Sequence, residues 1–175
     1  MRNISFILAG IAIMVIFSSS VLAQTTENTV AGAKIVPALT LTENLPMHFG
    51  TMTVKSGQGG TCIVSTAGVR SKTGGVTLQA LAPFMSLATY TVSGEPTRTY
   101  SIILPMTIAV TCTGYSMTIG TLLAKSTSGI ESHTATGTLG AGGTEQFTIG
   151  ATLTVGAGQF EGIYSGTFDV SVAYN

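Results

Sequence analysis

Hydrophobic and polar residues alternate with a period of two along much of this chain, most clearly at its carboxyl end. Between residues 160 and 175 the odd positions are mostly polar, whereas every even position carries an apolar residue or glycine. The large side chains at even positions are Phe160, Tyr164, Phe168, Val170, Val172 and Tyr174. Because successive side chains of a strand point to opposite faces, the pattern predicts a β-strand over 160–175 with these six side chains on its buried face.

The same period predicts further strands upstream. The first is expected to begin at Lys34 and to end before Gly50, and the clearest runs from Phe147 to Val155. Shorter alternating runs occupy 76–80, 108–112 and 117–123.

Two connections can also be predicted from the turn residues. Gly94, Glu95 and Pro96 separate two alternating runs, which predicts a hairpin between 90–92 and 100–104. The Ser/Thr/Gly-rich stretch 125–143 is interpreted as a surface loop with at most one short strand.

Eight to ten short strands separated by turn residues, without helical periodicity, predict an all-β fold. We expect an antiparallel β-sandwich, immunoglobulin-like or pilin-like, that forms one domain over residues 34–175. The polar, weakly patterned residues 24–33 are expected to form a flexible amino-terminal arm.

The first 23 residues have the composition of a signal peptide. Arg2 supplies a positive charge, residues 4–17 are almost wholly apolar, and small residues lead up to Ala23, after which we predict cleavage. An uncleaved anchor is the alternative interpretation. No later segment approaches the roughly 20 apolar residues of a transmembrane helix. We therefore expect an exported protein of the periplasm, cell surface or extracellular medium, with no transmembrane segment in the mature chain.

Charge is sparse and balanced in this chain. Lys and Arg number 7, Asp and Glu number 7, and charged residues make up only 8% of the sequence. Nucleic-acid binding needs several phosphate contacts from a basic patch, which this sequence does not offer. A surface covered mainly by hydroxyl groups is instead typical of an extracellular β-protein.

The sequence contains 2 cysteines, Cys62 and Cys112. In an exported protein two cysteines most simply form one disulfide, and we predict this pairing. A metal site is the alternative, but two thiols without nearby histidines fall short of the four ligands that zinc usually takes.

Residue types that support catalysis are few. His48, His133 and Asp169 are the only histidines and the only aspartate, and serines alone do not make a hydrolytic triad. The glycine clusters at 140–143 and 156–158 lack the lysine and the helix of a phosphate-binding loop. We expect no catalytic residues, no cofactor and no metal, and hence a protein that is not an enzyme.

Tyrosines are the remaining candidates for ligand contact. Tyr90, Tyr100 and Tyr164 share the apolar parity of their strands and are predicted to pack in the core. Tyr115 follows Gly114 in a predicted turn, so it is the one tyrosine expected to be exposed and able to contact a ligand.

Several segments, taken in order, resemble the bacterial exported family called domain of unknown function 4402. They are Pro37–Leu41, His48–Thr51, Gly75–Leu78, Tyr90–Pro96, Thr99–Pro105 and Gly150–Tyr174. The terminal strand is also similar to the last strand of chaperone–usher pilin subunits, in which an aromatic residue precedes the final one. That second resemblance implies a periplasmic chaperone and an usher as partners.

The expected function is therefore structural. We predict an exported, fimbria-like or cell-surface subunit, active in adhesion or assembly, that self-associates through its strand edges. A monomeric secreted module that binds glycans or proteins is the alternative.

Overall fold

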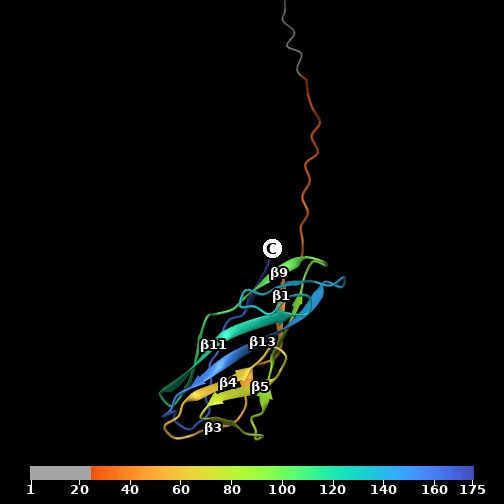
Figure 1. The fold of residues 1–175 in the computed structure, drawn as a ribbon. Helices are drawn as coiled ribbons and strands as arrows, with labels where there is room; N and C mark the ends of the chain where they lie inside the picture. Colours follow the sequence, from red (N-terminus) through yellow and green to blue (C-terminus); the bar gives the residue numbers. More distant parts are fainter. Residues whose placement is uncertain (1–24) are drawn as a thin grey trace, which may run out of the picture. The chain divides into compact units, whose positions relative to one another are not determined.

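The structure is a computed structural model that describes residues 25–175 (Figure 1). The predicted signal peptide, residues 1–23, lies outside the described residues. The chain divides into two units, Met1–Lys34 and Ile35–Asn175. In the first unit, residues 25–34 are exposed and contain neither helix nor strand. The second unit contains all the secondary structure described below.

Residues 35–175 fold into fourteen strands, and no helix occurs in the described part of the chain. In chain order the strands are β1 (Thr40–Leu45), β2 (His48–Phe49), β3 (Met52–Val54), β4 (Gly60–Val64), β5 (Arg70–Gly74), β6 (Val76–Leu78), β7 (Met85–Ser86), β8 (Ala88–Ser93), β9 (Thr99–Ile103), β10 (Ile108–Cys112), β11 (Tyr115–Ser126), β12 (Thr136–Thr138), β13 (Thr144–Val155) and β14 (Ser171–Tyr174).

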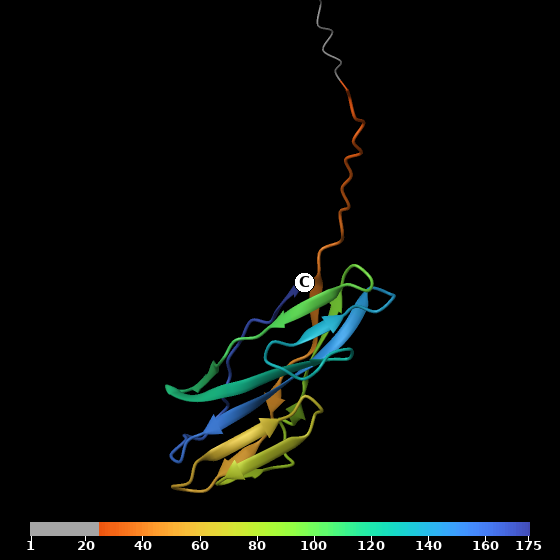
Figure 2. The same ribbon diagram turned by 45° about the horizontal axis from the view of Figure 1, so that its top comes forward.

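The strands form one seven-stranded sheet, one three-stranded sheet and two two-stranded ribbons, and all pairs are antiparallel. The large sheet has the order β1-β8-β13-β11-β10, with β4 also paired to β13 and β5 paired to β4. β13 is its central strand, because β8 and β4 follow one another along one of its edges while β11 occupies the other (Figure 2). The small sheet has the order β12-β9-β14. The two ribbons pair β2 with β7 and β3 with β6.

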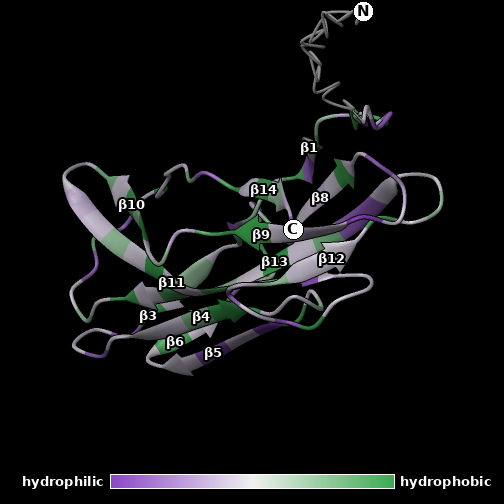
Figure 3. Cartoon of the chain, turned by 90° about the horizontal axis from the view of Figure 1, so that it is seen from above, coloured by the Kyte–Doolittle hydropathy of each residue, from purple (hydrophilic) through white to green (hydrophobic). Residues whose placement is uncertain are grey.

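One hydrophobic core joins the two sheets. Tyr100 and Ile102 of β9 are buried in the same cluster as Phe147 and Ile149 of β13 and Leu122 of β11. Hydrophobic and polar bands alternate along β11 in Figure 3, as expected for a strand with one face on the core. The predicted all-β, antiparallel, sandwich-like fold is confirmed. Strands outnumber the predicted eight to ten because several contain only two or three residues.

Two local predictions differ from the structure. The segment 90–104 is not a hairpin, because β8 belongs to the large sheet and β9 to the small one, so the turn at 94–98 is an arch between sheets. The first strand begins at Thr40 rather than Lys34, and Ile35 is 96% exposed. Its pairing with β8 shifts register between Glu43 and Leu45, which leaves Leu45 on the surface.

A bulge interrupts the long pair β11–β13. The register shifts between Gly120 and Leu123, and Thr121 within it has a φ of 49°, an uncommon value for a β-branched residue. Opposite the bulge, Gly150 lies against the backbone of the segment that follows β4. A Cβ at Gly150 would lie 2.6 Å from the Thr66 nitrogen. The central strand therefore lies in close contact with this segment at Gly150, opposite the bulge.

Candidate functional site

The carboxyl-terminal segment crosses from one sheet to the other. Ser165 forms an isolated antiparallel bridge with Thr111 of β10, and β14 then pairs with β9 in the small sheet. Five of the six predicted core-facing side chains pack half-buried against the core: Tyr164, Phe168, Val170, Val172 and Tyr174. The odd-numbered residues between them are exposed.

The regular strand is shorter than the sixteen residues predicted, because only Ser171–Tyr174 has a ladder partner. The physical reason is that the segment passes between two different sheets and cannot hydrogen-bond continuously to either. Gly166 permits a close approach on the way, since a Cβ there would lie 2.5 Å from the Ala109 carbonyl oxygen.

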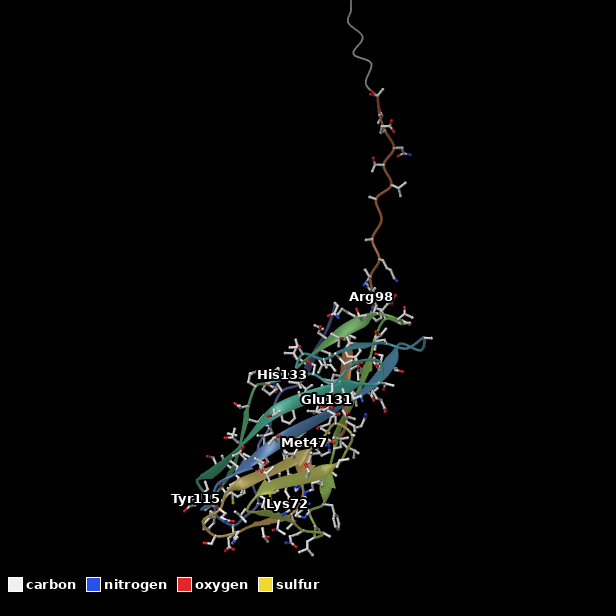
Figure 4. The ribbon with its side chains drawn as sticks, viewed as in Figure 1. Met47, Lys72, Arg98, Tyr115, Glu131 and His133 are labelled. Carbon is white, nitrogen blue, oxygen red and sulfur yellow. The ribbon has the colours of Figure 1, made fainter. Side chains whose placement is uncertain are left out.

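Phe160 is the one predicted core-facing residue that lies on the surface. It is 44% exposed, and its ring stacks on that of Tyr115 with centroids 4.8 Å apart and planes inclined by 7°. Tyr115 is 48% exposed and begins β11, at the end of the sheets opposite Arg98 (Figure 4). Ile163, close by in the chain, is also exposed. Tyr115, Phe160 and Ile163 are called the aromatic tip below.

The hydroxyl group of Tyr174 connects three segments that are distant in the sequence. It accepts a hydrogen bond from the Glu95 backbone N–H at 2.6 Å, in the arch between β8 and β9. It also donates to the Pro37 carbonyl oxygen at 3.0 Å, just before β1. The penultimate aromatic residue therefore fastens the end of β14 to the beginning of the large sheet.

β14 is an edge strand with an open side. Ser171–Tyr174 pairs only with β9, and the Asn175 N–H donates to the Thr99 carbonyl oxygen at 3.2 Å. Because hydrogen-bonded and non-hydrogen-bonded pairs alternate in an antiparallel ladder, the backbone groups of Val172 and Tyr174 point away from β9. We refer to these outward backbone groups as the β14 edge.

The edges of the two sheets differ in how they are protected. β5, at an edge of the large sheet, carries Arg70 and Lys72, and charged residues of this kind discourage pairing with another chain. β14 has the sequence Ser-Val-Ala-Tyr, without charge or proline. Its edge is thus chemically suited to accept a further strand.

Two buried tyrosines hydrogen-bond to carboxylates: Tyr100 of β9 to the buried Glu145 of β13, and Tyr90 of β8 to the exposed Glu43 of β1. The Tyr100 hydroxyl donates to Glu145 Oε2 at 2.8 Å, and the Tyr90 hydroxyl donates to Glu43 Oε1 at 3.2 Å. Burial raises the pKa of Tyr90 to about 12, and the neighbouring Glu43 carboxylate adds to the shift. Burial, followed by the Glu145 hydrogen bond, likewise raises the pKa of Tyr100.

Sequence reasoning did not single out Glu145. Its side chain is only 9% exposed, although a carboxylate rarely lies inside a protein without a partner. A signal was present in the alternation, because Glu145 has the same parity as Phe147 and Ile149, whose side chains are buried. A charged residue on the core-facing parity of a strand therefore indicates a buried carboxylate with a hydrogen-bond partner.

A comparison with protein families finds one match. The model described as "Domain of unknown function (DUF4402)" matches residues 39–174. The chain belongs to this family. The matched DUF4402 region begins one residue before β1 and ends with the last residue of β14, so it includes every strand. A search of curated proteins and a search of solved structures each gave no match.

The predicted Cys62–Cys112 disulfide is not present in the DUF4402 domain, where both cysteines are free. Cys62 lies in β4 and Cys112 in β10, and strands β13 and β11 lie between them. Strand pairing places Cys62 opposite Leu153, Leu153 opposite Ile119, and Ile119 opposite Ile108. Three strand spacings therefore put the Cα atoms of Cys62 and Ile108 roughly 14 Å apart, and Cys112 lies still further along β10. A disulfide requires Cα atoms within about 7 Å.

Cys62 has the surroundings of a structural thiol. It is fully buried, and its Sγ donates to the Phe49 carbonyl oxygen at 3.8 Å. Burial raises the pKa of the Cys62 thiol, and the nearby Arg70 guanidinium offsets this only in part. A buried thiol with a raised pKa is chemically inert.

Both histidine side chains of the DUF4402 domain form hydrogen bonds with backbone groups. His48 Nδ1 accepts a hydrogen bond from the Gly50 N–H at 2.8 Å, and His133 Nδ1 lies 3.0 Å from the Leu122 carbonyl oxygen. Within residues 25–175 no group of three or more His, Cys, Asp or Glu side chains could hold a metal ion. In the same range no helix is long and apolar enough to cross a membrane.

Proposed function

We propose that this protein is an exported structural or adhesion protein, a fimbria-like or cell-surface subunit that acts by association and not by catalysis. The observation that carries the proposal is the β14 edge. Val172 and Tyr174 direct backbone donors and acceptors away from β9, on a strand that carries no protective charge or proline.

The proposed mode of association is strand addition. An incoming extended segment would hydrogen-bond to the β14 edge, while its alternate side chains would fix the register. The end of β14 is held in place by the Tyr174 hydroxyl, so little ordering of the receiving edge is needed on binding.

We propose that the added strand comes from a periplasmic chaperone before assembly, and from a second copy, delivered through an usher, afterwards. The amino-terminal arm of this chain is a weak candidate donor. Between residues 24 and 33 its apolar residues are Val30, Ala31 and Ala33 alone. The donated strand of a second copy is therefore expected to be one of its other edges, and the resemblance of β14 to a pilin strand supports this partner class.

The experiment compares Val172→Pro with Val172→Ala in the full, secreted chain. Both variants shorten the half-buried side chain, but only proline removes the backbone N–H that points away from β9. We expect Val172→Pro to lose assembly in size-exclusion chromatography with light scattering and in negative-stain images, and Val172→Ala to keep it. Thermal unfolding of both variants checks that the domain is still folded.

Two results would contradict strand addition at β14. One is a wild-type protein that stays a monodisperse monomer with and without a co-expressed chaperone and usher. The other is equal assembly of the proline and alanine variants.

A second candidate function is a monomeric glycan- or protein-binding module, and the aromatic tip favours it. Monomeric proteins seldom leave large aromatic residues together on the surface unless they bind something. If this module acts through the aromatic tip, Tyr115→Ala should abolish binding to cells or to a glycan array. Retained binding would remove the aromatic tip from consideration.

A further inference from the structure

A hollow of about 590 Å³ lies at the end of β11, where the loop toward β12 passes beside β8 and β13. Five of its lining residues are Thr91, Thr127, Ser128, Thr138 and Thr144. Lys, Arg, His and large apolar residues are absent from the lining. The hollow therefore offers nothing to balance the charge of an anionic ligand, and no apolar wall for a lipid chain.

Glu145 is the one ionisable residue of the lining, and its carboxylate is held by neutral donors. The Ser128 backbone N–H donates to Oε1 at 2.6 Å, and the Tyr100 hydroxyl donates to Oε2 at 2.8 Å. The Glu145 side chain is only 9% exposed, and these two hydrogen bonds use two of the roughly four lone-pair sites of its carboxylate. A hydrogen bond to such a buried charge is stronger than one between neutral groups.

The rim of the hollow is ordered before any ligand binds. The Thr127 hydroxyl donates to the Gln146 carbonyl oxygen at 3.1 Å, and the Thr138 N–H donates to Ser128 Oγ at 2.8 Å. On the opposite side, Thr91 Oγ1 accepts from an asparagine of β1 at 2.9 Å. Because Ser128 and Thr91 act as acceptors here, their own O–H groups can donate to a ligand. Such pre-ordering lowers the entropy cost of binding.

We infer that this hollow binds a neutral saccharide. Sugar hydroxyls would donate to Glu145 and exchange hydrogen bonds with the Ser and Thr hydroxyls, while the sugar C–H groups would contact the threonine methyl groups. The volume lies within the roughly 300–1,000 Å³ of small-molecule sites. The inference rests on the second candidate function, the binding module. It places the sugar at the end of β11 that is opposite Tyr115, and the two ends of this twelve-residue strand are roughly 40 Å apart. It does not depend on strand addition at β14.

The experiment measures binding of neutral and anionic sugars to the full secreted chain. Lactose, maltose and chitobiose are titrated at millimolar concentration by NMR and calorimetry, with sialyllactose as the anionic comparison. We expect at least one neutral disaccharide to bind and to shift the amide signals of residues 138–146. We expect sialyllactose to bind no more tightly than lactose.

Matched variants locate the site. Thr144 and Thr154 are both exposed threonines of β13 but lie at opposite ends of it. Loss of one neutral hydrogen bond should make Thr144→Val bind about fivefold more weakly, whereas Thr154→Val should match the wild type. Glu145→Gln should bind about tenfold more weakly, with its fold checked by thermal unfolding.

Each other outcome overturns the inference. If no neutral disaccharide binds, the hollow is not a saccharide site. If one binds with equal affinity to the Thr144→Val and Thr154→Val variants, the site lies elsewhere. In that case loss of binding on Tyr115→Ala would keep the binding module and transfer it to the aromatic tip.

Discussion

Tyr90, on the buried face of β8, should make the stability of the folded protein depend on pH in the alkaline range. Its side chain is buried, its hydroxyl donates a hydrogen bond to the exposed Glu43 carboxylate, and burial raises its pKa from the ordinary 10.0 to about 12. In the unfolded chain the phenol ionises near pH 10, whereas in the folded protein it stays neutral. A group whose folded pKa is raised contributes stability below its unfolded pKa and loses it as the pH rises through its folded pKa.

The size of this effect follows from the two pKa values. A difference between 10.0 and about 12 corresponds to about 2.7 kcal/mol when the whole range has been crossed. About half of that, roughly 1.4 kcal/mol, should be lost by pH 11, because the phenol of the unfolded chain is mostly ionised at that pH while the phenol of the folded protein is still mostly neutral. Replacing Tyr90 by Phe removes the ionisable group and with it this part of the pH dependence.

Urea unfolding followed by circular dichroism at about pH 8 and at about pH 11 measures the difference. The free energy of unfolding of Tyr90→Phe should fall between the two pH values by about 1.4 kcal/mol less than that of the wild type. Tyr115→Phe is the matched control, because Tyr115 is 48% exposed and its variant should follow the wild type. An identical loss of free energy in wild type and Tyr90→Phe would refute the reasoning.

Three further tests of the packing use urea unfolding. Gly150→Ala should lower the free energy of unfolding by about 3 kcal/mol, because the three atoms nearest to the new Cβ, at 2.6–2.8 Å, are all backbone atoms. Gly142→Ala is the control and should leave stability nearly unchanged, since nothing lies within 4 Å of its Cβ. Equal stability of the two variants would contradict the close approach at Gly150. Tyr174→Phe removes two hydrogen bonds and should cost about 2 kcal/mol, and an unchanged midpoint would show that the hydroxyl contributes nothing. Val170→Asp should lower the free energy of unfolding by about 2 kcal/mol and Ser171→Asp by less than about 0.5 kcal/mol, since only Val170 packs on the core. Similar losses of stability in the two variants would refute the assignment of these residues to opposite faces of the strand.

Local pattern predicted local structure well in this chain. The alternation from Phe147 to Val155 lies within β13, and Tyr90 and Tyr100 are buried as their parity indicated. The even-numbered residues after Tyr164 lie against the core even where the backbone forms no ladder. Side-chain parity depends only on an extended backbone, so it is visible in the sequence without knowledge of the strand partner.

The pairing between strands that are distant in the sequence was harder to predict from the sequence. The arch at 94–98 has the turn residues of a hairpin, and only the partners of β8 and β9 show that it joins two sheets. The number of cysteines suggests a Cys62–Cys112 pair, but sequence spacing does not show that two strands separate β4 from β10. Phe160 has the parity of the core-facing residues, yet it lies on the surface because the chain has not reached the small sheet at that point.

The position of β13 has a consequence for how the protein folds. β4, β8 and β11 all hydrogen-bond to this strand, which follows every one of them in the sequence. Until β13 is available, the backbone groups with which β4, β8 and β11 would pair to it have no hydrogen-bond partner. The large sheet therefore cannot be completed before residue 155 is available, and folding should be slow, because Thr61 must pair with Thr154, which is 93 residues away. A helper that shields nascent strands would act on this protein during that interval.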